Sequence, residues 1–154
     1  MKPKLTLNPI RFAQETTYTC GPAALRTVGA RLGIKKSEKT FAKLLQDNRV
    51  SGVAPASFAG AVQKLKLTFF AKDHAGWSDL GDALKTHQVI IGYFLPWEKI
   101  GHFAVVEHVT QNAITLFDPL GGKIREYKRS YFERLWRRGF RYDLERNWFC
   151  GIKK

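Results

Sequence analysis

The chain has 154 residues, of which 44% are hydrophobic and 13% aromatic, and we expect residues 1–154 to form one domain with its own core. Its 26 Lys and Arg against 13 Asp and Glu give a formal charge of +13, which attracts acidic partners such as nucleic acid, an acidic peptide or an anionic membrane. The most apolar run, residues 89–96, is too short to span a membrane, and residues 1–14 have no apolar run typical of a signal peptide. We therefore expect a cytoplasmic protein without a membrane span, unless it is exported without such a signal.

The first half of the sequence predicts mainly helices. Cys20-Gly21-Pro22 starts a helical pattern, because a proline loses nothing in the first turn, where its N–H would have no partner. Gly33 is a plausible stop, since glycine is favoured just past the end of a helix. The further elements, in chain order, are a helix capped by Ser37 over residues 37–47, a helix over 55–65, a strand over 67–71 and a short helix capped by Ser78.

The second half of the sequence predicts a sheet. Strand-like runs alternate with turns, of which Pro119-Leu120-Gly121-Gly122 is the clearest. The expected elements are strands over residues 89–95, 102–109, 113–118 and 123–127, a helix over 130–138 and a further strand within 142–150. Because helices come first and strands later, the sequence predicts an α+β fold, with an N-terminal helical part packed on a C-terminal antiparallel sheet.

Cys20 is the first residue whose position suggests chemistry. It stands at the start of a predicted helix, where unpaired N–H groups and the positive end of the helix dipole favour a thiolate. Such a cysteine suits a nucleophile, and the alternative is a small apolar residue of the core. The other cysteine, Cys150, fits no motif, and we interpret it as structural or idle. Two cysteines without a CxxC pair predict neither a disulfide framework nor a structural zinc site.

His102 and Asp118 stand at the ends of two successive predicted strands. If these strands form a hairpin centred on Gln111, Asp118 faces Ala104, and His102 lies on the same face two residues away. The two side chains are then diagonal neighbours, about 7–8 Å apart at the backbone, a gap that an imidazole and a carboxylate can bridge. A slip of one residue would place them on opposite faces. The alternatives are a surface histidine and an ordinary Asp-Pro turn.

Gln14 lies six residues before Cys20, on an irregular segment. Its side-chain amide could donate a hydrogen bond to an oxyanion that forms beside the sulfur. The alternative is an exposed polar residue with no such role.

The histidines do not predict a metal site. His102 and His108 are expected on one strand face, but six residues of strand span about 20 Å, too far to share one ion. His74 and His87 have no partners at the spacing of metal ligands. No metal and no cofactor are therefore expected.

Together these motifs resemble those of a known family, the bacteriocin-processing cysteine peptidases that cleave double-glycine leaders. QETTYTCGPAALRTVGARLG, residues 14–33, is similar to the nucleophile motif of that family. GHFAVVEHV followed by LFDP is similar to its histidine and aspartate motifs. SGVAPASFAGAVQKLKL and SYFERLW resemble two of its helices, so the similarity covers about residues 8–137.

The resemblance implies a papain-like fold and a thiol-dependent hydrolysis of a peptide or other amide bond. It implies that Cys20 is the nucleophile, His102 the general base and acid, Asp118 the group that orients the imidazole, and Gln14 the oxyanion donor. The implied partner is a peptide or protein substrate, and an acidic one would match the charge. Double-glycine leaders are one substrate class, and domains of this type also serve as deamidases, amidases and other proteases.

The best-known members of this family are N-terminal domains of membrane-embedded, ATP-driven exporters. This sequence has neither a membrane span nor the GxxxxGK[ST] motif of a P-loop. Transport is therefore not expected of this chain, and the resemblance implies a stand-alone peptidase domain.

A basic, aromatic segment supports a different interpretation. Residues 134–148 interleave Arg with Trp, Phe and Tyr, side chains that can stack on bases and bind phosphates. The alternative function is therefore a nucleic-acid-binding module, and another is a catalytically inactive, peptidase-like interaction domain. The aromatic residues could instead pack inward from a solvated basic helix. Thiol reactivity distinguishes these functions, because a binding module has no reason to activate Cys20.

Overall fold

The computed structural model of the protein describes residues 7–47, 52–139 and 146–154. In this part of the chain, one six-stranded sheet has the order β1-β6-β2-β3-β4-β5, and each neighbouring pair is antiparallel. The strands are β1 (Thr68–Lys72), β2 (Gln88–Leu95), β3 (Ile100–Val109), β4 (Ala113–Asp118), β5 (Lys123–Lys128) and β6 (Trp148–Lys153). The helices are α1 (Cys20–Arg31), α2 (Glu38–Leu44), α3 (Ser57–Lys64), α4 (Trp77–Leu84), α5 (Arg129–Arg138) and the 3-10 turn η1 (Leu120–Gly122).

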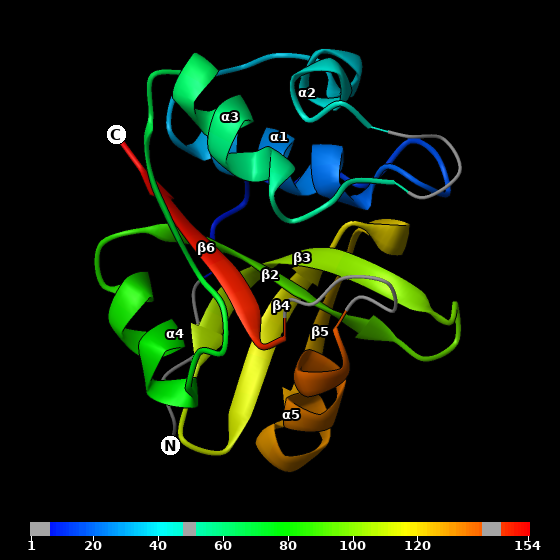
Figure 1. Ribbon diagram of the computed structural model, residues 1–154, viewed down its shortest axis with the longest axis vertical. Helices are drawn as coiled ribbons and strands as arrows, with labels where there is room; N and C mark the ends of the chain where they lie inside the picture. Colours follow the sequence, from blue (N-terminus) through cyan, green and yellow to red (C-terminus); the bar gives the residue numbers. More distant parts are fainter. Residues whose placement is uncertain (1–6, 48–51, 140–145) are drawn as a thin grey trace.

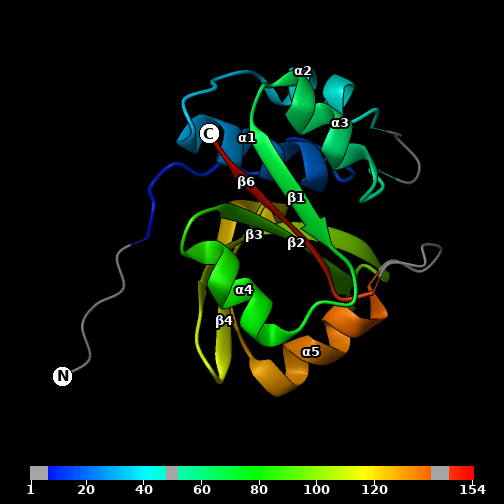
Figure 2. The same ribbon diagram turned by 60° about the vertical axis from the view of Figure 1, so that its left-hand side comes forward.

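Each face of the sheet carries a hydrophobic core, because successive residues of a strand point to opposite faces. On one face, Ile90 and Val105 pack under the layer of α1, α2 and α3 (Figure 1). On the other face, Ile91 and Ala104 pack against α4 and α5, and Figure 2 shows the sheet between the two groups of helices. The expected α+β fold, with a helical part on an antiparallel sheet, is confirmed. The sequence did not predict the second helical group as a separate layer.

The helix α1 starts and ends where the sequence predicts. It begins at Cys20, and Gly33 adopts a φ of 92° just beyond its end, a conformation that glycine takes without strain. Gly29 lets α2 approach closely, since a Cβ there would lie 3.0 Å from Cζ of Phe41. With 12 residues, α1 is the longest helix of the described residues, and no helix among them is both long and apolar enough to cross a bilayer.

The predicted caps and strand ends are only partly correct. Ser37 caps α2 as expected, with its side chain accepting a hydrogen bond from the N–H of Thr40 at 3.2 Å. Ser78 does not cap α4. The N-cap is Gly76, two residues earlier, and its N–H donates to Asp79 Oδ2 at 2.7 Å. The carboxylate of Asp79, three residues after the N-cap, thus stabilises the start of the helix in place of the serine hydroxyl.

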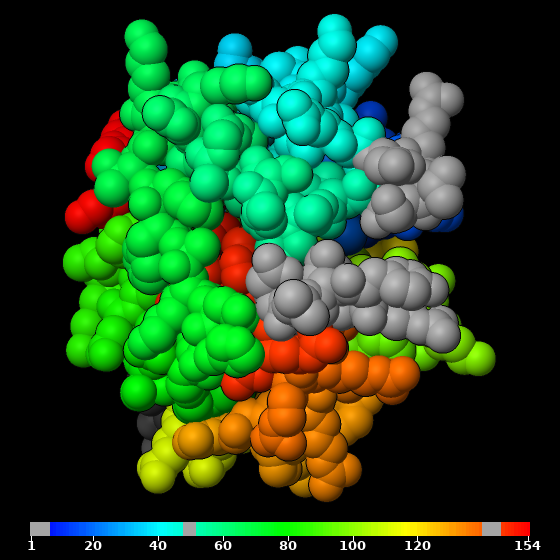
Figure 3. Space-filling model, viewed as in Figure 1, coloured from blue at the N-terminus to red at the C-terminus, as the bar shows by residue number. Residues whose placement is uncertain are grey.

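The last strand lies inside the sheet, next to the edge strand β1. We expected it within residues 142–150, but β6 runs over Trp148–Lys153, and residues 142–145 lie outside the described part of the chain. It pairs with β1 on one side and β2 on the other. Figure 3 shows part of β6 (red) between α2 and α3 (cyan to teal) above and α4 (green) and α5 (orange) below. Its place between two strands and two helical layers explains why it is almost entirely buried.

Candidate active site

The pairing of β3 with β4 decides where His102 and Asp118 lie. At one end of the hairpin, Val105 is opposite Phe117. This is the register expected from the sequence, and it places Asp118 opposite Ala104. Since side chains two residues apart share a face, Asp118 falls on the face of His102.

The other end of the hairpin has a different register. Val109 is opposite Ile114, one residue out of step, and Glu107 is the extra residue of a β-bulge on β3. Without this bulge, the register of the turn would continue along the strands and place Asp118 on the face opposite to His102. An irregularity near the turn therefore brings the two residues together.

The bulge is anchored to α1 by a buried ion pair. Nη2 of Arg31 donates to Oε1 of Glu107 at 2.6 Å, and the two side chains are 2% and 5% exposed. Two further N–H groups of the guanidinium donate to Oε1 of Gln88 at 3.1 Å and to the carbonyl oxygen of Ile10 at 2.9 Å. The last residue of α1 is thereby joined to the strand that carries His102.

The bulge also overturns one expectation about the histidines. Val106 and Val109 pack in the same core although they are three residues apart, so the strand changes face between them. His108 therefore does not share the face of His102, and its side chain is exposed. Within the described ranges, no three His, Cys, Asp or Glu side chains gather in a way that could hold a metal ion.

His102 and Asp118 form a direct, buried contact. Nε2 of His102 lies 2.6 Å from Oδ1 of Asp118, with the side chains 2% and 0% exposed. Asp118 also accepts hydrogen bonds from the N–H of Leu120 at 2.9 Å and from Nε of Arg125 at 2.8 Å. Burial alone would raise the pKa of Asp118, but the hydrogen bonds from His102 and these two donors hold it below its usual value. Asp118 is therefore ionised and turns Nε2 of the imidazole toward itself.

Cys20 lies within hydrogen-bonding reach of the same imidazole. The thiol is partly exposed at the first residue of α1, where the helix dipole favours a negative charge. Burial lowers the pKa of His102, yet the charge of Cys20 and the hydrogen bonds to Asp118 and Cys20 outweigh it and raise that pKa to about 9. Since Nε2 faces Asp118, Nδ1 is the ring nitrogen left for the sulfur. With this raised pKa, His102 is an imidazolium beside the Cys20 sulfur at neutral pH.

Gly21 allows the start of α1 to come this close to the sheet. A Cβ at Gly21 would lie 3.2 Å from Cβ of Val53 and 3.5 Å from the ring of Phe103. Phe103 is the neighbour of His102 on β3, so a larger residue after Cys20 would push the sulfur away from the imidazole.

Gln14 is joined to the turn that follows Asp118. Its backbone N–H donates to the carbonyl oxygen of Pro119 at 2.8 Å. One N–H of its side chain donates to the carbonyl oxygen of Thr16 at 2.8 Å, and Oε1 is buried without a hydrogen-bond partner among the described residues. Because a primary amide carries two hydrogens, one N–H is still free to donate.

Sequence reasoning missed two side chains at the site. Tyr93 on β2 is opposite His102, fully buried, and its ring meets the imidazole edge-on with centroids 5.5 Å apart. Arg125 on β5 binds Asp118 and lies over the ring of Trp97 at 5.2 Å. Tyr93 interrupts the apolar run VIIGYFL, which was a usable signal, whereas nothing in the local sequence marks Arg125.

The basic, aromatic segment does not present its tryptophans to solvent. Trp136 is 1% and Trp148 5% exposed, and the indole N–H of Trp136 donates to the carbonyl oxygen of Trp148 at 3.0 Å. These rings pack inward and cannot stack on bases, so the structure does not support a nucleic-acid partner. Residues 140–145 of the segment lie outside the described part of the chain.

The fold and the cysteine–histidine–aspartate arrangement are those of a papain-like cysteine peptidase. The family model described as "Peptidase C39 family" matches residues 10–140, and the chain belongs to this family. An uncharacterized protein of Methanothermobacter thermautotrophicus is 30% identical over 122 residues, which are 79% of this chain and 79% of that protein.

Solved structures share the fold. The peptidase domain of Streptococcus ComA, described as a bifunctional ABC transporter involved in quorum sensing, has a TM-score of 0.74 at 20% identity, over 92% of this chain and 96% of that chain. A double-glycine motif protease from an AMS/PCAT transporter, in complex with the leader peptide, has a TM-score of 0.67 at 16% identity, over 93% and 89%. A putative C39-like peptidase from Bacillus anthracis has a TM-score of 0.69 at 13% identity, over 95% of each chain.

Proposed function

We propose that this protein is a cysteine peptidase that hydrolyses a peptide or other amide bond through a thioester on Cys20. The observation that supports this most directly is the buried contact of Asp118 with Nε2 of His102, which leaves Nδ1 of the same ring for the Cys20 sulfur. Cys20, His102 and Asp118 thus lie in the order that activates a thiol, which supports their proposed roles as nucleophile, base and orienting carboxylate.

The proposed reaction has two stages. The Cys20 thiolate attacks the carbonyl carbon, and the resulting oxyanion accepts hydrogen bonds from the backbone N–H of Cys20 and the side-chain amide of Gln14. The C–N bond then breaks, and the His102 imidazolium gives its proton to the leaving amine. In the second stage, neutral His102 takes a proton from water, the hydroxide adds to the thioester, and the acid leaves as the thiolate–imidazolium pair returns.

A peptide leader of the double-glycine type is the substrate class we propose. The AMS/PCAT protease, which shares this fold, was solved in complex with its leader peptide. The net charge of +13 favours a leader with acidic residues, because opposite charges speed the encounter and hold the complex.

The first experiment is alkylation by iodoacetamide between pH 4 and 9, with the labelled site identified by mass spectrometry. We expect rapid labelling of Cys20 well below pH 8, slowed at least about tenfold in His102→Ala, because the imidazolium stabilises the thiolate. Cys150 serves as the internal control and stays unlabelled in the folded protein, since its side chain is fully buried.

Cleavage of synthetic Gly-Gly leader peptides, acidic and neutral, then tests the substrate class. Slow labelling of Cys20 with the pH profile of a free thiol, unchanged in His102→Ala, would contradict the proposed mechanism. Fast labelling without cleavage of either leader would keep the nucleophile and reject the leader as substrate.

A further inference from the structure

We propose that Glu38 is a positioning residue for the oxyanion site, which holds the segment between Gln14 and Cys20 in the conformation that presents the Gln14 amide to the reacting carbonyl. The inference rests on the proposed function and adds a residue that lies on a different helix from the nucleophile.

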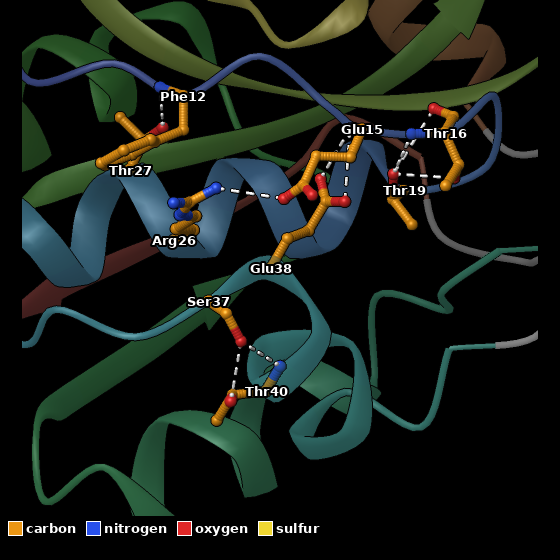
Figure 4. A network of polar contacts seen from close by, with 9 residues as sticks. All are labelled: Phe12, Glu15, Thr16, Thr19, Arg26, Thr27, Ser37, Glu38 and Thr40. Carbon is orange, nitrogen blue, oxygen red and sulfur yellow. Dashed lines mark hydrogen bonds and ion pairs between the residues drawn. The ribbon is translucent and has the colours of Figure 1, made fainter.

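Glu38 binds both ends of this segment from the first turn of α2. Its two carboxylate oxygens accept the backbone N–H of Glu15, the residue after Gln14, at 3.1 and 3.2 Å (Figure 4). The side chain of Thr19, the residue before Cys20, also interacts with this carboxylate and lowers its pKa. One carboxylate therefore fixes the distance between the chain at the proposed oxyanion donor and the chain at the nucleophile.

Between these ends the segment is a closed turn. The N–H of Thr16 donates to Oγ1 of Thr19 at 3.1 Å, and the two threonine hydroxyls are 2.9 Å apart. The side chain of Gln14 donates into the same turn, to the carbonyl oxygen of Thr16. Because these internal hydrogen bonds make the turn rigid, a contact from outside the turn fixes the position of the whole turn. Figure 4 shows Glu38 outside the turn, on α2.

Two consecutive N–H groups thus fix the backbone at Gln14. Its own N–H binds the carbonyl oxygen of Pro119, next to Asp118, and the following N–H binds Glu38. Since these bonds run to two separate elements, they set the position and direction of the Gln14 side chain relative to both. Of these two backbone hydrogen bonds, loss of Glu38 would leave only the one to Pro119.

A purely structural role explains less well why a carboxylate is buried at this position. Glu38 is 4% exposed, burial raises its pKa, and among the described residues it forms no ion pair. Arg26, the cation that acts on it, binds Glu15 at 3.2 Å instead. A buried carboxylate is costly unless its hydrogen bonds repay the loss of water, and here those bonds go to the backbone and side chain of the oxyanion segment.

Two reagents separate the oxyanion site from the thiolate. p-Nitrophenyl acetate acylates the cysteine by attack on a carbonyl: a C–S bond forms, an oxyanion develops, and p-nitrophenolate leaves. Iodoacetamide alkylates the same sulfur by displacing iodide, with no oxyanion. The ratio of the two rate constants therefore reports on the oxyanion site without knowledge of the natural substrate.

We expect Glu38→Ala to lower the acylation rate constant about tenfold or more, which is part of the ~10²–10³-fold loss expected when an oxyanion donor is removed. The alkylation rate constant should stay within about twofold of the wild-type value. Glu38→Gln should recover most of the loss, because its amide oxygen still accepts the N–H of Glu15. The matched control is Asp79→Ala, which removes another first-turn carboxylate that accepts a backbone N–H, here in α4 and at 2.7 Å, and should change neither rate.

A double variant provides the decisive readout. If Glu38 acts through Gln14, adding Glu38→Ala to Gln14→Ala lowers acylation no further, because coupled residues are not additive. Three results would each overturn the inference. They are losses that multiply in the double variant, an acylation rate unchanged in Glu38→Ala, and acylation and alkylation rates that fall together in a variant that still folds by circular dichroism. A wild-type Cys20 that reacts with both reagents no faster than a free thiol would instead overturn the proposed function.

Discussion

The two cysteines lie in regions that differ in exposure and in the charge around the thiol. Cys20 is partly exposed at the start of α1, beside the buried imidazole of His102. Cys150 is in the middle of β6, fully buried in the core under α1–α3, where burial raises the pKa of its thiol far above the usual range. Both are free, so neither restrains the other. Since a helix start with a cationic neighbour favours a reactive thiol and an apolar core disfavours one, the surroundings rather than the residue type single out Cys20 as the proposed nucleophile.

The largest expected effect is on turnover when the exposed thiol is removed. Cys20→Ala should abolish cleavage of a leader peptide, a loss on the order of 10⁶-fold in kcat, because no other group can form the thioester. Cys150→Ala, the matched control, should cleave at the wild-type rate. The contrast between the two regions fails if Cys20→Ala retains activity, or if Cys150→Ala loses it while folded.

The second effect concerns the carboxylate behind the imidazole. Asp118→Asn should lower kcat about 10–10²-fold with little change in KM, since the neutral amide orients the ring less firmly and leaves Arg125 without its counter-charge. Steady-state kinetics on the leader peptide measure this, and a thermal melt checks that the fold is kept. An unchanged kcat would reduce Asp118 to a turn residue.

The third prediction is the titration of His102. Its pKa in the folded protein is raised from 6.5 to about 9, so the imidazolium persists through neutral pH and is lost as the pH rises through about 9. The stabilisation that this charge adds to folding is therefore complete below about pH 6.5 and disappears toward pH 9. Two-dimensional NMR of the imidazole should show this pKa, and a lower one in Cys20→Ala, because the charge of Cys20 is the largest of the raising influences. A pKa near 6.5 in the wild type would contradict the ion pair.

The smallest effect is on stability at the buried thiol. Cys150→Ala should lower the free energy of unfolding by about 1 kcal/mol, as one buried atom is lost from a packed core. Cys150→Ser should cost more, because it buries a hydroxyl instead. Denaturant unfolding measures both. If either variant changed the alkylation of Cys20, the two regions would not be independent.

Local features of the fold could be predicted well. Pro22 and Gly33 marked the ends of α1, Ser37 marked the start of α2, and the Pro119 turn separated β4 from β5, because each depends on a few neighbouring residues. The residues of the candidate site could also be proposed from the sequence, since a cysteine at a helix start and a spaced histidine and aspartate are visible there. Tyr93 and Arg125 were not, because their roles depend on which strands are neighbours.

The sequence by itself determined which groups are available and which elements carry them. Only the tertiary structure decided that they meet. The register at His102 and Asp118 depends on the bulge at Glu107, and that bulge is held by Arg31, 76 residues earlier in the chain. A pattern of alternating residues cannot reveal such a bulge. It shows the period of a strand, but not the distant side chain that holds an extra residue in it and so changes the register. The physical reason is that one unpaired residue reverses the face of every residue beyond it.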